Sequence, residues 1–248
     1  MKDPGWLVLA GFAGGLIGSM AGLASLISYP ALLAVGLPPL SANVSNTVAL
    51  VFGGVGSVSG SMTELRGQRA LARRLGAIAI AGGICGGLLL LATPSGAFVR
   101  IVPWLIGAAS LAILVPRRSV PPASARTRRA TWALGGGVFL IAVYGGYFGA
   151  AAGVLLLALL LTLTEESLAR ANAMKNLLAG LANAVAAVAF VAFGPVRWWA
   201  IVPLAVGFLV GGRLGPVIVR NAPPGPLRAL IACAGVALAI HLGLDAYR

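Results

Sequence analysis

Long apolar runs dominate this chain and restrict its fold more than any other feature. Runs near 43–63, 75–93, 98–115, 171–193, 199–219 and 226–244 reach or exceed the roughly 18–20 residues that cross a bilayer core as a helix. Only 9% of the residues are charged, whereas a soluble domain has about 25%. The mean hydropathy is +0.99. The sequence therefore predicts one all-α polytopic membrane domain over residues 1–248.

Two further runs, 6–37 and 132–163, are too long for one straight crossing. A helix over the first run would extend about 48 Å at 1.5 Å per residue, against a bilayer core of about 30 Å. Both runs are rich in glycine, which permits backbone conformations that other residues avoid. The first run also contains Pro30. We therefore expect each run to be a broken or re-entrant segment.

The two glycine-rich runs begin the two halves of an internal repeat. The segment G-S-M-A-G (18–22) aligns with G-A-A-A-G (149–153), and A-N-V-S-N-T (42–47) aligns with A-N-A-M-K-N (171–176). Paired broken segments in a duplicated membrane protein are typical of secondary transporters. The expected parts are repeat 1 (5–116), a linker (117–130) and repeat 2 (131–246).

Two topologies satisfy this pattern. If each glycine-rich run crosses once, the chain makes eight passes; if each is a re-entrant hairpin, each half makes three passes and the halves are inverted. Both alternatives place the arginine-rich loops 66–74 and 117–129 in the cytoplasm, where basic residues gather. The hairpin alternative leaves fewer basic residues outside, namely Lys2, Arg100, Arg197 and Arg248. The charge distribution thus favours two inverted repeats, each with a glycine-rich segment and three transmembrane helices.

Polar residues within the apolar helices predict a binding site. Asn43 and Asn46 are three residues apart and share one helix face, and Asn172, Lys175 and Asn176 do the same in the other repeat. We expect both groups at helix starts, where free N–H groups and the positive end of the helix dipole attract anions. The expected substrate-binding residues are Asn43, Asn46, Thr47, Asn172, Lys175, Asn176, Tyr29, Tyr147, Gly18, Gly22, Gly149 and Gly153.

A purely structural interpretation of the same residues stays open. Ser41 would cap a helix, and asparagine side chains often form hydrogen bonds between membrane helices. Lys175 lies five residues after Arg170 and would extend toward a membrane surface. Tyr29 and Tyr147 would then be packing residues at an interface.

Other kinds of chemistry lack the residues that they need. Cys85 and Cys233 lie far apart and His241 has no neighbouring ligand residues, so we expect no metal centre, disulfide or cofactor. No nucleophile and base can be paired, and we expect no enzyme. The basic residues cluster in short loops between the apolar runs, and this distribution argues against a nucleic-acid partner. The acidic residues that a proton-coupled transporter would use are Glu64, Glu165 and Glu166, which all adjoin helix ends.

The order and duplication of these motifs resemble the TauE/SafE family of sulfite and organosulfonate exporters. The residues that carry the resemblance are G-L-I-G-S-M-A-G (15–22), Pro30, A-N-V-S-N-T (42–47), G-Q-R (67–69), G-Y-F-G-A-A-A-G (146–153), A-N-A-M-K-N-L-L-A-G (171–180) and R-W-W (197–199). The resemblance implies transport of sulfite, sulfoacetate or a similar anion.

We therefore expect a secondary transporter for a small sulfur-containing anion in a bacterial cytoplasmic membrane. Its expected partners are the anion, the lipid bilayer, a coupling proton or ion, and a second copy in a homodimer. Two alternatives stay open. One is a carrier or channel for a carboxylate, amino acid or other small solute, and the other is a non-transporting membrane subunit of a complex.

Overall fold

A computed structural model describes residues 4–114, 128–219, 240 and 244. All regular structure within these residues is α-helical, so the predicted all-α fold is confirmed. Most of the expected linker and of the last apolar run lie outside the described residues. Cys233 and His241 lie outside them too.

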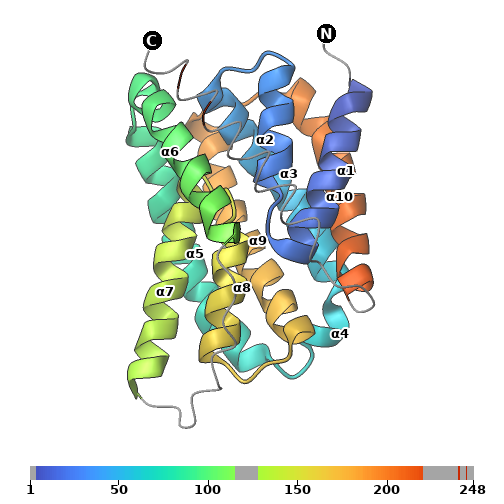
Figure 1. Cartoon of the computed structure of the whole chain (residues 1–248), viewed down its shortest axis with the longest axis vertical. Helices are drawn as coiled ribbons and strands as arrows, with labels where there is room; N and C mark the ends of the chain where they lie inside the picture. The colour runs from blue at the N-terminus through green and yellow to red at the C-terminus, as the bar shows by residue number, and fades with distance from the viewer. Residues whose placement is uncertain (1–3, 115–127, 220–239, 241–243, 245–248) are drawn as a thin grey trace.

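The first glycine-rich run forms a helical hairpin. Helix α1 (Pro4–Ala21) ends before Gly22, whose φ of +81° is a left-handed conformation that glycine adopts without steric cost. Helix α2 (Ser25–Ala34) begins three residues later. In Figure 1, α1 runs from the upper end of the molecule to its middle, and α2 returns to the same end.

The second run repeats this geometry from the opposite end. Helix α7 (Arg128–Tyr147) rises from the lower end, and α8 (Ala152–Leu163) returns to it after a break at residues 148–151. Gly149 has a φ of +75° at this break, and Ala151 has a φ of +57°. The hairpins therefore meet in the middle of the molecule, which is the geometry that two inverted repeats require. The inverted topology within a membrane stays a prediction.

Long helices surround the two hairpins. They are α3 (Pro39–Gly60), α5 (Arg69–Ala92), α6 (Ser95–Leu114), α9 (Leu168–Phe193) and α10 (Trp198–Val219), with the short α4 (Met62–Leu65) after α3. Helix α10, from the second half of the chain, packs against α1 and α3. In the same way, α5 from the first half packs against α7 and α9. Each hairpin is thus held by a helix of the other repeat.

Glycines allow these helices to approach closely. A Cβ atom on Gly207 of α10 would collide with the carbonyl oxygen of Val8 in α1, and one on Gly86 of α5 would collide with that of Val143 in α7. Membrane helices gain stability from such contacts because lipid offers no hydrophobic drive for their association.

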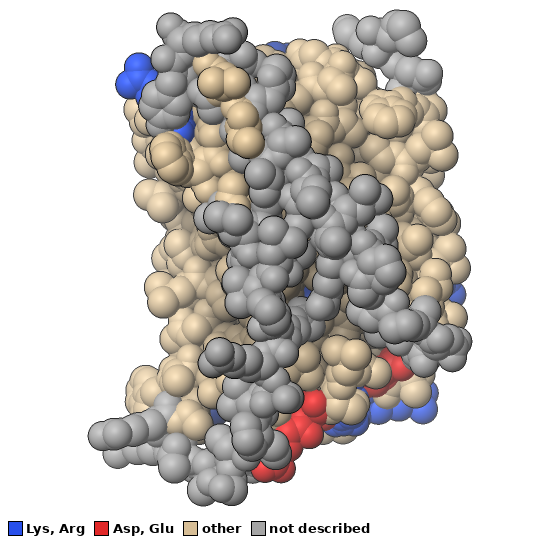
Figure 2. Space-filling model, viewed as in Figure 1, with Lys and Arg blue, Asp and Glu red and all other residues tan. Residues whose placement is uncertain are grey.

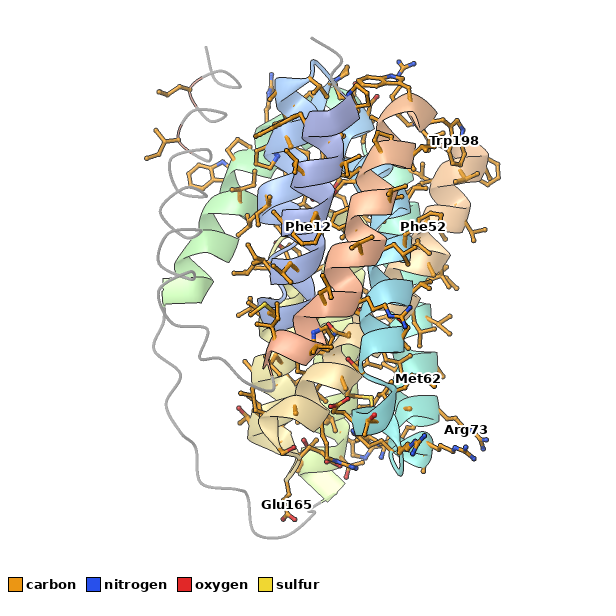
Figure 3. The ribbon with its side chains drawn as sticks, turned by 90° about the vertical axis from the view of Figure 1, so that its right-hand side faces the viewer. Phe12, Phe52, Met62, Arg73, Glu165 and Trp198 are labelled. Atoms are coloured by element: carbon orange, nitrogen blue, oxygen red, sulfur yellow. The ribbon has the colours of Figure 1, made fainter. Side chains whose placement is uncertain are left out.

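Charge and length together indicate how the molecule lies in a membrane. Five described helices, α1, α5, most of α7, α9 and most of α10, are long and apolar enough to cross it. Figure 2 shows the visible acidic side chains at the lower end, with basic side chains beside them and a largely uncharged band above. Figure 3 places Arg73 and Glu165 at this lower end and Trp198 at the upper end. The chain is a multi-pass membrane protein.

Candidate functional site

A cavity of about 90 Å³ lies where the two hairpin tips face α3 and α9. By the same measure a cavity needs only about 10–15 Å³ to hold one water molecule, so this one accommodates a small solute. Its polar lining residues are Ser19, Ser25, Thr47, Ser57, Lys175, Asn176 and Asn183. Glycines from both hairpins complete the wall, including Gly18, Gly22, Gly149 and Gly153.

Helices α3 and α9 line the cavity with equivalent positions. Thr47, Leu50, Gly53 and Gly54 of α3 correspond, at one offset of 129 residues, to Asn176, Ala179, Ala182 and Asn183 of α9. This offset equals the one that pairs Asn43 with Asn172 in the sequence. The two polar motifs therefore belong to helices that occupy equivalent places around one cavity.

The helix breaks follow a different register from the one that the sequence alignment predicts. The left-handed glycines are Gly22 and Gly149, so Gly18 and Gly22 correspond to Gly145 and Gly149. Sequence alignment pairs Gly18 with Gly149 instead, one helical turn away, and is wrong on this point. The reason is that glycine recurs every four residues at 145, 149 and 153, so spacing alone cannot select the glycine at the break.

Three side chains of α9 converge on the end of α1. The Lys175 Nζ atom lies 3.0 Å from both the Gly18 and the Ser19 carbonyl oxygens. The amides of Asn172 and Asn176 donate to the Ser19 carbonyl at 3.0 and 3.2 Å. The last carbonyls of a helix have no partner within the helix and carry the negative end of its dipole. Lys175 and the two asparagines therefore supply hydrogen-bond donors to the broken end of α1.

The motif on α3 contacts both hairpins. The Asn43 amide donates to the Tyr147 carbonyl at the end of α7, at 2.9 Å. The Asn46 amide donates to Ser25 Oγ at the start of α2, at 3.2 Å. Thr47 Oγ1 donates within its own helix to the Asn43 carbonyl. Asn43 and Asn172 thus play matching parts, because each caps the broken helix of the other repeat.

The structure divides the twelve expected residues into two groups. Those that line the cavity are Thr47, Lys175, Asn176, Gly18, Gly22, Gly149 and Gly153. Those that lie behind its wall are Asn43, Asn46, Asn172, Tyr29 and Tyr147. In this second group, the three asparagines hold the hairpins, and Tyr29 packs edge-on against Phe148 with ring centroids 5.4 Å apart. Tyr147 packs against Phe98.

The helix starts at the cavity are not the ones expected from the sequence. Helices α3 and α9 begin at Pro39 and Leu168, and their polar residues lie at least one turn further on. The N-termini at the cavity belong instead to α2 and α8, whose first residues Ser25 and Ala152 line it. Most of their first N–H groups donate to carbonyls of the preceding turn, as Leu26 does to Leu23 and Val154 does to Ala151. What both termini bring to the cavity is the positive end of the helix dipole.

Sequence reasoning missed four polar lining residues, namely Ser19, Ser25, Ser57 and Asn183. Asn183 had a usable signal, because it lies seven residues after Asn176 and so shares its helix face. Its side chain is half-buried and has no hydrogen bond to any residue that the structure describes. The serines gave no signal, since Ser19 and Ser25 reach the cavity only through the hairpin geometry.

The acidic residues lie away from the cavity. Glu166 forms an ion pair with Arg170 at the start of α9. Glu165 and Glu166 border a separate pocket of about 680 Å³, together with Arg74 and Gln68. Neither they nor Glu64 line the cavity at the hairpin tips. Within the described ranges, no three His, Cys, Asp or Glu residues lie together as a metal site.

Two broken helical hairpins that meet at a polar cavity within a multi-pass bundle define the class of membrane transporters. The family described as Sulfite exporter TauE/SafE matches residues 7–242. This chain therefore belongs to the TauE/SafE family, and it is a membrane transporter.

Relatives match along nearly their whole length. A probable membrane transporter protein, ORF9, from Sinorhizobium sp is 29% identical over 97% of this chain and 92% of the relative. The probable membrane transporter protein YfcA of Escherichia coli (strain K12) is 26% identical over 98% and 90%. A probable membrane transporter protein of Haemophilus influenzae is 27% identical over 91% and 88%. No solved structure matches the chain.

Proposed function

We propose that this protein is a secondary transporter that moves a small sulfur-containing anion, such as sulfite or sulfoacetate, across the cytoplasmic membrane. The observation that carries the proposal is the meeting of two helix N-termini and one lysine at a single cavity. Broken helices whose N-termini face an anionic substrate are a recurring design in transporters. The description of the family supports a sulfur oxyanion as the substrate.

The charges around the cavity favour a monoanion. Helices α2 and α8 begin there, and each N-terminus carries roughly half a positive elementary charge. Helices α1 and α7 end there, and their C-termini carry roughly the opposite charge. These partial charges cancel in pairs, so Lys175 leaves about one positive charge among the described lining residues. A positive charge at this position favours an anion over a cation or a neutral solute.

The hydrogen-bond donors around the cavity suit an oxyanion. Asn176 and Asn183 bring amide groups from α9, and Ser25 brings a hydroxyl group from α2. An oxyanion has several acceptor oxygens and accepts strong, charge-assisted hydrogen bonds. The volume of about 90 Å³ favours a compact anion over a long-chain sulfonate.

Exchange of labelled sulfite by the purified chain in lipid vesicles tests the proposal. We expect sulfite uptake, with competition by sulfoacetate and methanesulfonate and much weaker competition by acetate and glycine. Better competition by acetate or glycine would favour the alternative carrier for a carboxylate or amino acid. An absence of exchange with every solute would contradict the proposal and favour a non-transporting subunit.

Two variants test whether the transported anion binds in the cavity. Asn183→Ala removes one amide from the lining, and we expect the affinity for sulfite to fall roughly two- to tenfold, the value of one hydrogen bond of about 0.5–1.5 kcal/mol. Arg213→Gln is the control, because Arg213 is an exposed residue on α10 that does not line the cavity. Equal effects of the two variants would argue against the cavity as the binding site.

A further inference from the structure

Helices α1 and α7 break at matching places, but their last carbonyls have different contacts. In the register of the helix breaks, residues 18–19 of α1 correspond to residues 145–146 of α7. The carbonyl oxygens of Gly18 and Ser19 accept hydrogen bonds from Lys175 Nζ, both at 3.0 Å. Within the part of the chain that the structure describes, no donor reaches the carbonyl oxygen of Gly145 or Gly146. The two broken ends therefore differ in whether a lysine contacts them.

Helix α3 brings oxygen atoms to the end of α7, where α9 brings a lysine to the end of α1. Asn46 corresponds to Lys175 at the offset of 129 residues that relates the two motifs. The Asn43 amide donates to the Tyr147 carbonyl, and the Asn46 amide donates to Ser25 Oγ. Both asparagines are 1% exposed, and neither side-chain oxygen has a hydrogen-bond partner. Because buried polar atoms nearly always have a partner, these two oxygens indicate a ligand.

The chemistry of this place suits a cation of low charge. The C-terminal end of a helix carries roughly half a negative elementary charge. Amide and carbonyl oxygens are ligands for hard cations, and the C-terminal ends of broken helices coordinate Na⁺ in other transporters. The described residues of α2, α3 and α7 include no carboxylate that would offset the charge of a divalent ion. A monovalent cation therefore fits better than Ca²⁺ or Mg²⁺.

We propose that the broken end of α7 binds a small monovalent metal cation, Na⁺ or K⁺, through the side-chain oxygens of Asn43 and Asn46 and the free carbonyls of residues 145–146. The cation occupies the place that the Lys175 side chain occupies in the other repeat. It is a coupling ion, bound and released during transport, and its neutral oxygen ligands differ from the His, Cys and carboxylate ligands of a resident metal centre.

The site adjoins the cavity, which connects cation binding to anion binding. Gly145 and Ser25 both line the cavity. A cation beside them attracts an anion in the cavity at close range. If the cation strengthens anion binding by some factor, the anion strengthens cation binding by the same factor. This coupling rests on the proposed function, whereas the cation site itself does not.

Thermal unfolding of the purified chain tests the cation site without any substrate. The protein is titrated with NaCl or KCl, and choline chloride keeps the ionic strength and the chloride concentration constant. A ligand that binds only the folded state raises the melting temperature as its concentration passes the Kd. We expect such a rise with at least one of the two metal ions, and the ion with the larger effect is the one that the site selects. Equal melting temperatures in all three salts would overturn the inference.

Three variants assign the cation to the end of α7. Asn46→Ala removes one proposed ligand, and we expect it to lose most of the response to the metal ion. Asn46→Lys places a lysine at the position equivalent to Lys175, so we expect no response to the metal ion. Asn172→Ala is the matched control, because it removes an equally buried asparagine from the other repeat and should keep the full response. A full response in both Asn46 variants, or its loss in Asn172→Ala, would overturn the assignment.

Binding of choline methanesulfonate in NaCl, KCl or choline chloride tests the coupling. We expect binding to be roughly 5- to 150-fold tighter in the salt of the selected ion, the usual range of such coupling. Equal affinity in the three salts would overturn the coupling while leaving anion binding intact. Stabilisation by the metal ion without any binding of methanesulfonate would count against the proposed function and leave the cation site in place.

Discussion

At the scale of single residues, buried asparagines fix where the broken helices end. The Ser19 carbonyl accepts hydrogen bonds from Asn172, Lys175 and Asn176, whereas the described donor to the Tyr147 carbonyl is Asn43 alone. A buried carbonyl that loses every partner costs about 1–3 kcal/mol, but one that keeps other donors costs less. The two matched asparagines therefore differ in what they contribute to stability.

This difference gives a prediction for the two alanine variants. We expect Asn43→Ala to lower the free energy of unfolding by about 1–3 kcal/mol, because Tyr147 loses its donor. Asn172→Ala should cost about 0.5–1.5 kcal/mol, because two donors to Ser19 remain. Thermal unfolding of both variants in the same detergent measures the order. A larger loss in Asn172→Ala than in Asn43→Ala would contradict this account of the capping bonds.

At the scale of helices, glycine at the break decides where each hairpin turns. Gly22 has a positive φ, and its backbone also touches the other hairpin: a Cβ on Gly153 would lie 2.6 Å from Gly22 Cα. Gly36 has a similar φ of +90°, but no atom lies near the Cβ that it would carry. Gly22 and Gly36 thus share a positive φ, but of the two only Gly22 is in close contact with another helix. Substitutions at the two positions therefore distinguish the cost of backbone strain from the cost of close packing.

We expect Gly36→Ala to destabilise the protein by about 1–2 kcal/mol, the cost of a left-handed conformation. Gly22→Ala should lose clearly more, because the added methyl group must also push the hairpin tips apart. Melting temperatures of the two variants, with transport measured on the same samples, test this expectation. Equal melting temperatures would show that the contact between the tips contributes little.

The sequence was enough to predict much at this scale. Run length and glycine content predicted both breaks, since no straight helix of 32 residues fits a bilayer core of about 30 Å. Asn43 and Asn172 were found because amides are rare and costly in lipid. What could not be predicted was their partners. The contact between α5 and α7 depends on backbone approach at Gly86, and glycine patterns do not say which helix approaches.

At the scale of the whole molecule, the two ends differ in charge. Arg66, Arg69, Arg73 and Arg74 follow α3 and begin α5, and Figure 3 places Arg73 at the lower end together with Glu165. Trp198 lies at the upper end. Because basic loops stay in the cytoplasm, we expect the lower end to face the cytoplasm and the hairpin of α1 and α2 to enter from outside.

Single cysteines test this orientation. After replacement of Cys85 and Cys233 by alanine, we expect Glu165→Cys to react with a membrane-impermeant reagent only from the cytoplasmic side. Trp198→Cys should react only from outside. Labelling of Glu165→Cys only from outside, and of Trp198→Cys only from the cytoplasmic side, would contradict inverted repeats and favour the eight-pass alternative, because α9 separates the two positions in both topologies.

The contact between Gly22 and Gly153 has a mechanical consequence. Neither residue has a side chain, so this meeting point has no rotamers with which to absorb a displacement of either hairpin. A displacement of one hairpin tip is then transmitted directly to the other tip. We therefore expect the two hairpins to move as whole bodies, and the path past the cavity to change only when the tips slide or part.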